Sequence, residues 1–112
     1  MNLRQQQNMF VMLVGKLIEF AYQAGYELSF GEAYRTPQQA SWNAAHKVGI
    51  SRSLHTERLA IDFNLFKGDK YLGETNDHLP LGEFWEKLHP LCRWGGRFGD
   101  GNHYSMEYNG VK

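Results

Sequence analysis

The sequence predicts an α+β fold in which a small, mostly antiparallel sheet is flanked by helices. Three observations support this class. Segments with helical periodicity and segments with strand periodicity both occur, the strand segments are short, and no linker, repeat or low-complexity stretch divides the 112 residues. A chain of this length forms one domain, residues 1–112, and buries roughly two-thirds of the surface that its unfolded state exposes.

Three segments have the pattern of amphipathic helices. They span residues 3–24, 37–47 and 81–89. In the first, apolar side chains at three- and four-residue steps form one stripe, and Gly25 stands where a C-terminal cap belongs. The second begins at Thr36-Pro37, which joins an N-cap residue to a proline at the first helical position.

Three further segments alternate between apolar and polar side chains, as half-buried strands do. They span residues 26–30, 59–66 and 103–108. The second alternates most clearly, because one of its faces carries only apolar side chains: Leu59, Ile61, Phe63 and Leu65. Residues 49–53 are predicted to form a loop and residues 67–70 a turn. The segment 94–102 holds four glycines and is predicted to be a loop as well.

Charge and composition exclude several classes of function. Twelve Lys and Arg residues balance twelve Asp and Glu residues, so the chain has no large field that would draw it to nucleic acid or to an anionic membrane. We therefore expect neither partner, and we expect a monomer. The single cysteine, Cys92, excludes an internal disulfide and a zinc site built from cysteines alone.

Nothing in the sequence has the pattern of an export signal. The longest apolar run, residues 9–14, is too short to cross a membrane, and the N-terminus is too polar for a signal peptide. We therefore expect synthesis in a cytoplasm. If the protein acts outside one, something else must release it.

Two strand segments place polar, metal-binding side chains on one face. Asp62 lies opposite the apolar face of the segment 59–66, and His103 begins the last strand segment. If these strands are neighbours, both side chains project from the same side of the sheet, and His55 can fold back to the same point. Two imidazoles and one carboxylate leave a fourth tetrahedral position for water, as in a catalytic zinc site. The alternative is that all three are ordinary polar groups of loops and strand faces.

Three blocks of sequence resemble a known family. The segment 53–62, Ser-Leu-His-Thr-Glu-Arg-Leu-Ala-Ile-Asp, is similar to the Ser-x-His-x-x-x-x-Ala-x-Asp signature of a family of zinc metallopeptidases. That family includes D-alanyl-D-alanine carboxypeptidases and L-alanyl-D-glutamate endopeptidases, and it has the hedgehog/DD-peptidase fold. The segments 32–37 and 94–103 resemble two further blocks of this family, and the three blocks occur along the chain in the same order as in the family. The short form without a signal peptide resembles phage endolysins and their prophage relatives.

The resemblance implies a role for each candidate residue. Zn²⁺ would be held by three ligands: His55, Asp62 and His103. Asp100, three positions before the last histidine, would be the general base, and Arg35 would hold a substrate carboxylate or the developing oxyanion. Ser53 would orient substrate or ligand, or it would only cap a turn. Trp94 would line a substrate groove, or it would cover the core.

The sequence departs from the family pattern at three positions. Arg58 stands where many members have glycine, and Ala33 stands where glycine is frequent. Neither is an expected ligand. The third is Asp100, because some branches have glutamate there, and the shorter side chain must come closer to the water that it deprotonates.

The expected function is zinc-dependent cleavage of the peptide stems of bacterial peptidoglycan, after release from the cytoplasm in which the chain is made. The resemblance favours an endopeptidase at the L-alanyl-D-glutamate bond. A D-alanyl-D-alanine carboxypeptidase is one alternative. A catalytically silent, zinc-stabilised module that binds the cell wall is another, although such a module has no need of an acid at Asp100.

Overall fold

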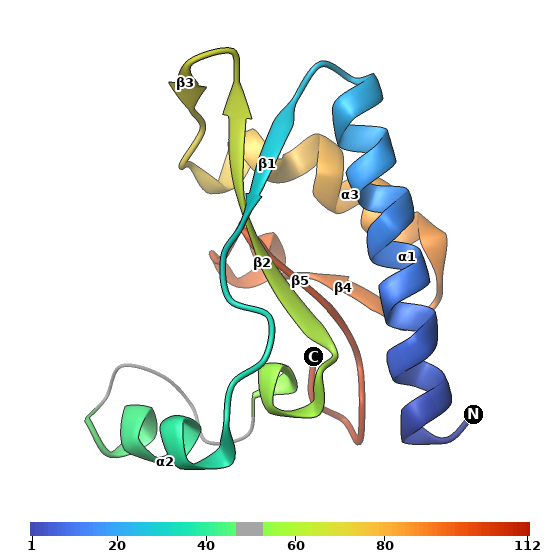
Figure 1. Cartoon of the computed structure of the whole chain (residues 1–112), viewed down its shortest axis with the longest axis vertical. Coiled ribbons are helices and arrows are strands. Elements are labelled where there is room, and N and C mark those ends of the chain that lie inside the picture. Colours follow the sequence, from blue (N-terminus) through green and yellow to red (C-terminus); the bar gives the residue numbers. More distant parts are fainter. Residues whose placement is uncertain (47–52) are drawn as a thin grey trace.

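A sheet whose strand pairs are all antiparallel organises the structure (Figure 1). The computed structural model describes residues 1–46 and 53–112. The strands are β1 (Glu27–Phe30), β2 (Ala60–Lys67), β3 (Lys70–Tyr71), β4 (Cys92–Trp94) and β5 (His103–Met106). The strand order in the sheet is β1-β2-β5-β4, and the short β3 pairs with the end of β2 across a tight turn. The long strand β2 therefore pairs with β1, β3 and β5.

Three α-helices and three short 3₁₀ helices accompany the sheet. The α-helices are α1 (Leu3–Gln23), α2 (Pro37–Ala45) and α3 (Leu79–Leu88), and the 3₁₀ helices are η1 (Leu54–Glu57), η2 (Thr75–His78) and η3 (Gly95–Phe98). In Figure 1, α1 and α3 pack together beside the sheet, whereas α2 lies apart at one end of the molecule. Among the described residues, no helix is both long and apolar enough to span a membrane.

The helix α1 forms where its apolar stripe predicts. Its N-cap is Asn2, whose side chain accepts the backbone N–H of Gln5, while the Gln5 side chain accepts the N–H of Asn2. The stripe enters the core, where Phe10 meets Trp85 of α3 edge-on at 5.7 Å between ring centroids. The core therefore lies between these two helices and one face of the sheet.

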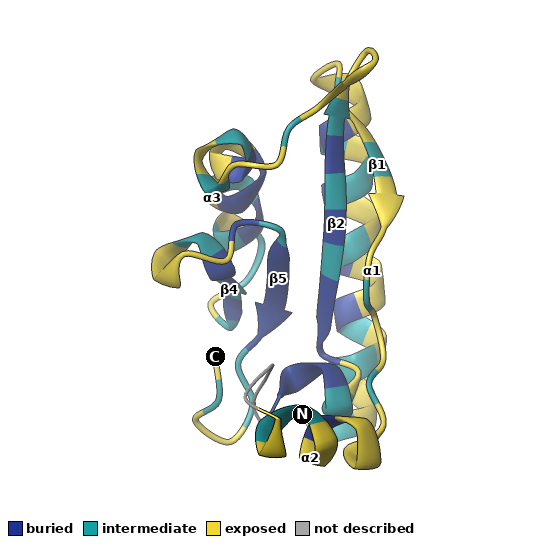
Figure 2. Cartoon of the chain, turned by 90° about the vertical axis from the view of Figure 1, so that its left-hand side faces the viewer, coloured by how far each residue is buried: buried dark blue, intermediate teal, exposed yellow. Residues whose placement is uncertain are grey.

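The sheet carries its apolar side chains where the alternation in sequence predicts them. Along β2, the side chains of Ile61, Phe63 and Leu65 are buried, and the residues between them are only partly buried. All four residues of β5 are buried, and the strand has a partner on each side. In Figure 2, β2 is banded in the colours of buried and intermediate residues and β5 is dark blue, whereas α2 is largely exposed.

The predicted fold class is confirmed, with differences at the ends of elements. The first helix ends at Gln23, and the third begins at Leu79, two residues earlier than predicted. The second ends at Ala45; its predicted extension to residue 47, like residues 49–52 of the predicted loop, lies outside the described residues.

The predicted loop over residues 94–102 is wrong in part. Its first residue, Trp94, ends the strand β4, and four of the others form η3. A strand of three residues is too short to show alternation, and glycines follow it directly. Its stability comes from pairing with β5, where Trp94 lies opposite Tyr104.

Candidate metal centre

The pairing of β2 with β5 sets Asp62 directly opposite His103. The Nδ1 atom of His103 lies 3.1 Å from the Oδ1 atom of Asp62. The two strands are therefore neighbours, which is the condition that the sequence analysis set for this site, and the two polar side chains meet on one side of the sheet. This register is fixed by the core, since a slip of one residue would turn the apolar side chains of β2 toward solvent.

His55 reaches the same point from η1, the turn before β2. Ser53 caps this turn, because its hydroxyl oxygen accepts the backbone N–H of His55 at 3.1 Å. The Nδ1 atom of His55 lies 2.9 Å from the carbonyl oxygen of Ala33. A carbonyl oxygen only accepts, so Nδ1 carries a proton, and Nε2 is the nitrogen that faces Asp62, at 3.3 Å from Oδ1.

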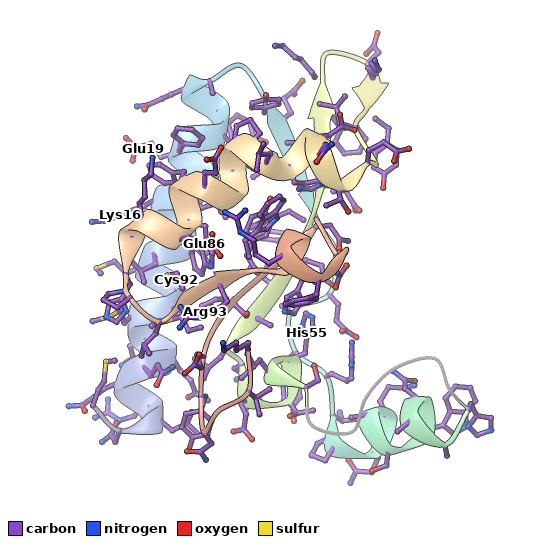
Figure 3. The ribbon with its side chains drawn as sticks, turned by 180° about the vertical axis from the view of Figure 1, so that it is seen from behind. Lys16, Glu19, His55, Glu86, Cys92 and Arg93 are labelled. Carbon is purple, nitrogen blue, oxygen red and sulfur yellow. The ribbon has the colours of Figure 1, made fainter. Side chains whose placement is uncertain are left out.

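The three predicted ligands form one group. His55, Asp62 and His103 each offer one ligand atom, and these atoms all lie within 4.8 Å of one another. Both imidazoles are almost enclosed, whereas the carboxylate is about one-fifth exposed. Two imidazole nitrogens and one carboxylate oxygen are the donors of catalytic zinc sites, so the residues present fit this ion. In Figure 3, His55 is seen between η3 and α2.

The electrostatics of the group favour an ionised Asp62. Burial alone would raise the pKa of this carboxyl, but hydrogen bonds from His103 and His55 outweigh burial and lower the pKa to about 2. The pKa of His55 is raised: its burial acts to lower it, and the hydrogen bonds to Asp62 and Ala33 prevail. Asp62 is therefore an anion throughout the physiological pH range.

The segment from Gly31 to Arg35 runs beside this group and is hydrogen-bonded to it through the backbone. The N–H of Gly31 donates to the carbonyl of Asp62, and the N–H of Asp62 donates to the carbonyl of Glu32, both at 2.8 Å. The N–H of Arg35 donates to the carbonyl of His55 at 3.2 Å. A Cβ at Gly31 would lie 3.0 Å from the Asp62 carbonyl oxygen, so a side chain there would force this close approach apart.

This segment adds an ion pair that sequence reasoning missed in part. The guanidinium of Arg35 donates from Nε to both carboxylate oxygens of Glu32, at 3.0 and 3.2 Å, and from Nη2 to Oε1. The same Oε1 atom lies 3.7 Å from Nε2 of His55. Arg35 was expected at the site and Glu32 was not. Opposite charges three residues apart, directly before a predicted helix start, are the signal that points to Glu32.

The remaining candidates differ in what the structure assigns to them. Asp100 is exposed, and its backbone is tied to the site, since its carbonyl accepts the N–H of His103 at 3.2 Å and its N–H donates to Gly95. Ser53 is buried and acts as the cap of η1, the second of the two roles considered for it.

Trp94 belongs to the core. Its side chain is buried, its indole N–H donates to the carbonyl of Gly101 at 2.7 Å, and its ring fills the space beside Gly82 and Gly96, where a Cβ would come within 2.1 and 2.2 Å of ring atoms. The expectation that Trp94 lines a substrate groove is therefore wrong. The structure agrees with the alternative, in which the ring of Trp94 covers the core.

Comparison with known proteins identifies the architecture. No protein-family model and no curated protein matches the sequence. Among solved structures, the L-Ala D-Glu endopeptidase ChiX of Serratia marcescens matches with a TM-score of 0.76 and 17% sequence identity, over 95% of this chain and 84% of ChiX. The chain therefore has the α+β fold of ChiX, a small antiparallel sheet flanked by helices.

Proposed function

We propose that this protein is a zinc-dependent peptidase that cleaves the peptide stems of bacterial peptidoglycan, as an endopeptidase at the L-alanyl-D-glutamate bond. One observation carries the proposal: two histidines and an aspartate from separate segments place their ligand atoms within 4.8 Å of one another. The fold shared with an L-Ala D-Glu endopeptidase supports the choice of substrate. We propose that it acts as a phage endolysin, which is synthesised in the cytoplasm and reaches the cell wall after release.

The residues of the chain divide the work of amide hydrolysis. Zinc bound by His55, Asp62 and His103 supplies Lewis-acid activation of water at neutral pH. Asp100 takes the proton of the attacking water and returns it to the leaving amine. Arg35 contacts the substrate; its guanidinium is bound to Glu32, whose Oε1 atom lies 3.7 Å from Nε2 of His55, and its backbone N–H donates to the carbonyl of His55.

The supporting contacts keep the ligands in place. The carbonyl of Ala33 orients the imidazole of His55, and the hydroxyl of Ser53 holds the turn that carries it. Because these contacts come from different segments, the ligand group depends on the folded domain as a whole.

Mass spectrometry of peptidoglycan fragments tests the proposal directly. Purified, zinc-loaded protein should release fragments that begin at D-glutamate, and the His103→Ala variant should release none. Release of D-alanine alone would instead show a carboxypeptidase. Binding of peptidoglycan without any new fragment would show a catalytically silent wall-binding module, and either result would overturn the proposed reaction.

A further inference from the structure

Glu32 and Arg35 form a pair whose chemistry differs from that of a lone arginine. The guanidinium uses Nε and Nη2 on the two carboxylate oxygens of Glu32, and within the described parts of the chain no protein atom accepts a hydrogen bond from Nη1. The Glu32 side chain is 36% exposed and the Arg35 side chain 15%. A carboxylate has about four acceptor positions, so Glu32 keeps acceptor capacity that faces solvent.

The pair therefore offers a donor beside an acceptor and has no net charge. A carboxylate on the substrate would bring two acceptors and a negative charge to a place that already holds Glu32. A primary carboxamide brings one acceptor and one donor, so its carbonyl oxygen can accept from Nη1 of Arg35 while its NH₂ group donates to Glu32. Hydrogen-bond complementarity and like-charge repulsion both favour the carboxamide.

The proposed function puts the cleaved bond at the three metal ligands, and the pair lies beside one of these ligands, where a residue next to that bond would be bound. The Oε1 atom of Glu32 is 3.7 Å from Nε2 of His55, the nitrogen that faces Asp62. A D-glutamate residue has two carboxyl groups, and whichever one continues the peptide, the other is left free as a carboxylate or as an amide. That free group is close to the bond that joins D-glutamate to L-alanine.

We propose that Glu32 and Arg35 recognise a carboxamide on the residue that follows the cleaved bond, so that the enzyme prefers stems with D-isoglutamine to stems with D-glutamate. This inference rests on the proposed peptidase function. In it, Glu32 is a specificity-determining residue: it cancels the charge of Arg35 and supplies the acceptor for the amide hydrogens. This inference replaces the expectation that Arg35 alone would hold a substrate carboxylate.

Two synthetic peptides that differ only in this group test the preference. One carries the free carboxylate of D-glutamate and the other the carboxamide of D-isoglutamine. For the zinc-loaded protein, kcat/KM should be about tenfold higher for the carboxamide peptide. Isothermal titration of both peptides into the zinc-free protein gives a second readout that does not depend on catalysis, and it should show the same order of affinities.

Variants identify the residue responsible. Glu32→Gln removes the charge and keeps the shape, so it should abolish or reverse the preference while melting temperature and zinc content stay near wild type. Glu32→Asp keeps the charge and should retain the direction of the preference. The matched control is Glu86→Gln, which removes the partner of Arg97 on the surface and should leave the preference unchanged.

The outcomes separate the two proposals. If neither peptide is cleaved, the proposed function is wrong, and the titrations still decide the inference about Glu32. If the wild type cleaves both peptides without preference, or prefers the carboxylate, the inference is overturned and the peptidase function stands. A preference that survives in Glu32→Gln, or binding of neither peptide in the titrations, also overturns it.

Discussion

Two arginine–glutamate pairs of this protein have nearly the same local chemistry and very different surroundings. Arg35 donates from Nε and Nη2 to Glu32, and Arg97 donates from Nε and Nη2 to Glu86, at 3.1 and 2.8 Å. The Arg97 side chain is 55% exposed, against 15% for Arg35. Figure 3 labels Glu86 on α3, away from His55.

The difference lies in what each pair is attached to. Glu86 also accepts the backbone N–H of Trp94 at 3.3 Å, so the surface pair fastens the end of β4 to α3. Glu32 and Arg35 instead belong to the segment that is hydrogen-bonded to Asp62 and His55. An arginine–glutamate pair thus stabilises the packing of a strand on a helix in one place, and in the other it lies beside the candidate metal ligands.

Substitution of a metal-ligating residue should have the largest effect on activity. Purified protein should contain about one zinc ion per chain. His55→Ala and His103→Ala should each lose the metal and all measurable peptidase activity, and treatment with a chelator should do the same to the wild type until zinc is restored. Metal analysis by mass spectrometry checks the stoichiometry. Full zinc content in both variants would show that the ligand assignment is wrong.

Substitution of Asp100, the proposed general base, should have the next largest effect. Asp100→Asn should keep zinc and fold, because the Asp100 backbone and not its side chain holds the turn before His103. Activity should fall by a factor on the order of 100 to 10,000, since the variant cannot accept a proton. Steady-state kinetics together with metal analysis separate the roles. Loss of metal along with activity would make Asp100 a ligand or its support.

A moderate effect is expected for Arg35→Lys. Lysine keeps the charge and loses the planar group that binds Glu32 and that we propose to contact the substrate. Turnover on purified peptidoglycan should fall while melting temperature and zinc content stay near wild type. If the pair had only a structural role, the melting temperature would fall, and activity would drop only in proportion to the folded fraction. Full activity would refute a contact with substrate.

The smallest effect is expected for Arg97→Lys, the matched change in the surface pair. Water and salt screen exposed ion pairs, so the free energy of unfolding should stay close to that of the wild type. Peptidase activity should stay at the level of the wild type. Denaturant titration and the same turnover assay give both numbers, and an activity loss equal to that of Arg35→Lys would remove the distinction between the two pairs.

The sequence predicted the elements whose periodicity is long or repeated, and two of these elements gave one contact on the condition that they are neighbours. The stripe of α1 and the alternation of β2 are set by burial, which acts over many residues. The meeting of Asp62 with His103 followed from two such alternations. The strand β4 was not predicted, because three residues are too few to show an alternation of apolar and polar side chains. Its stability depends on pairing with β5, a later segment of the chain.

The residues that were misjudged are those whose role depends on a neighbour far along the chain. Trp94 beside glycines is compatible with a groove or a core, and only its contact with Gly82 of α3 decides. Glu32 contributes to the site through Arg35 and His55, and a single sequence shows only the first of these relations.

The central position of β5 has a consequence for how the protein is made. A ribosome extends the chain from its N-terminus, so β4 emerges before β5, although β5 lies between β2 and β4 in the sheet. Until β5 is available, β4 has no strand to pair with, and β2 lacks one of its neighbours. The same strand brings His103, so the sheet and the ligand group are completed in one step. A nascent chain that has not reached residue 103 therefore has an unfinished sheet and lacks one of the three residues of the candidate metal centre.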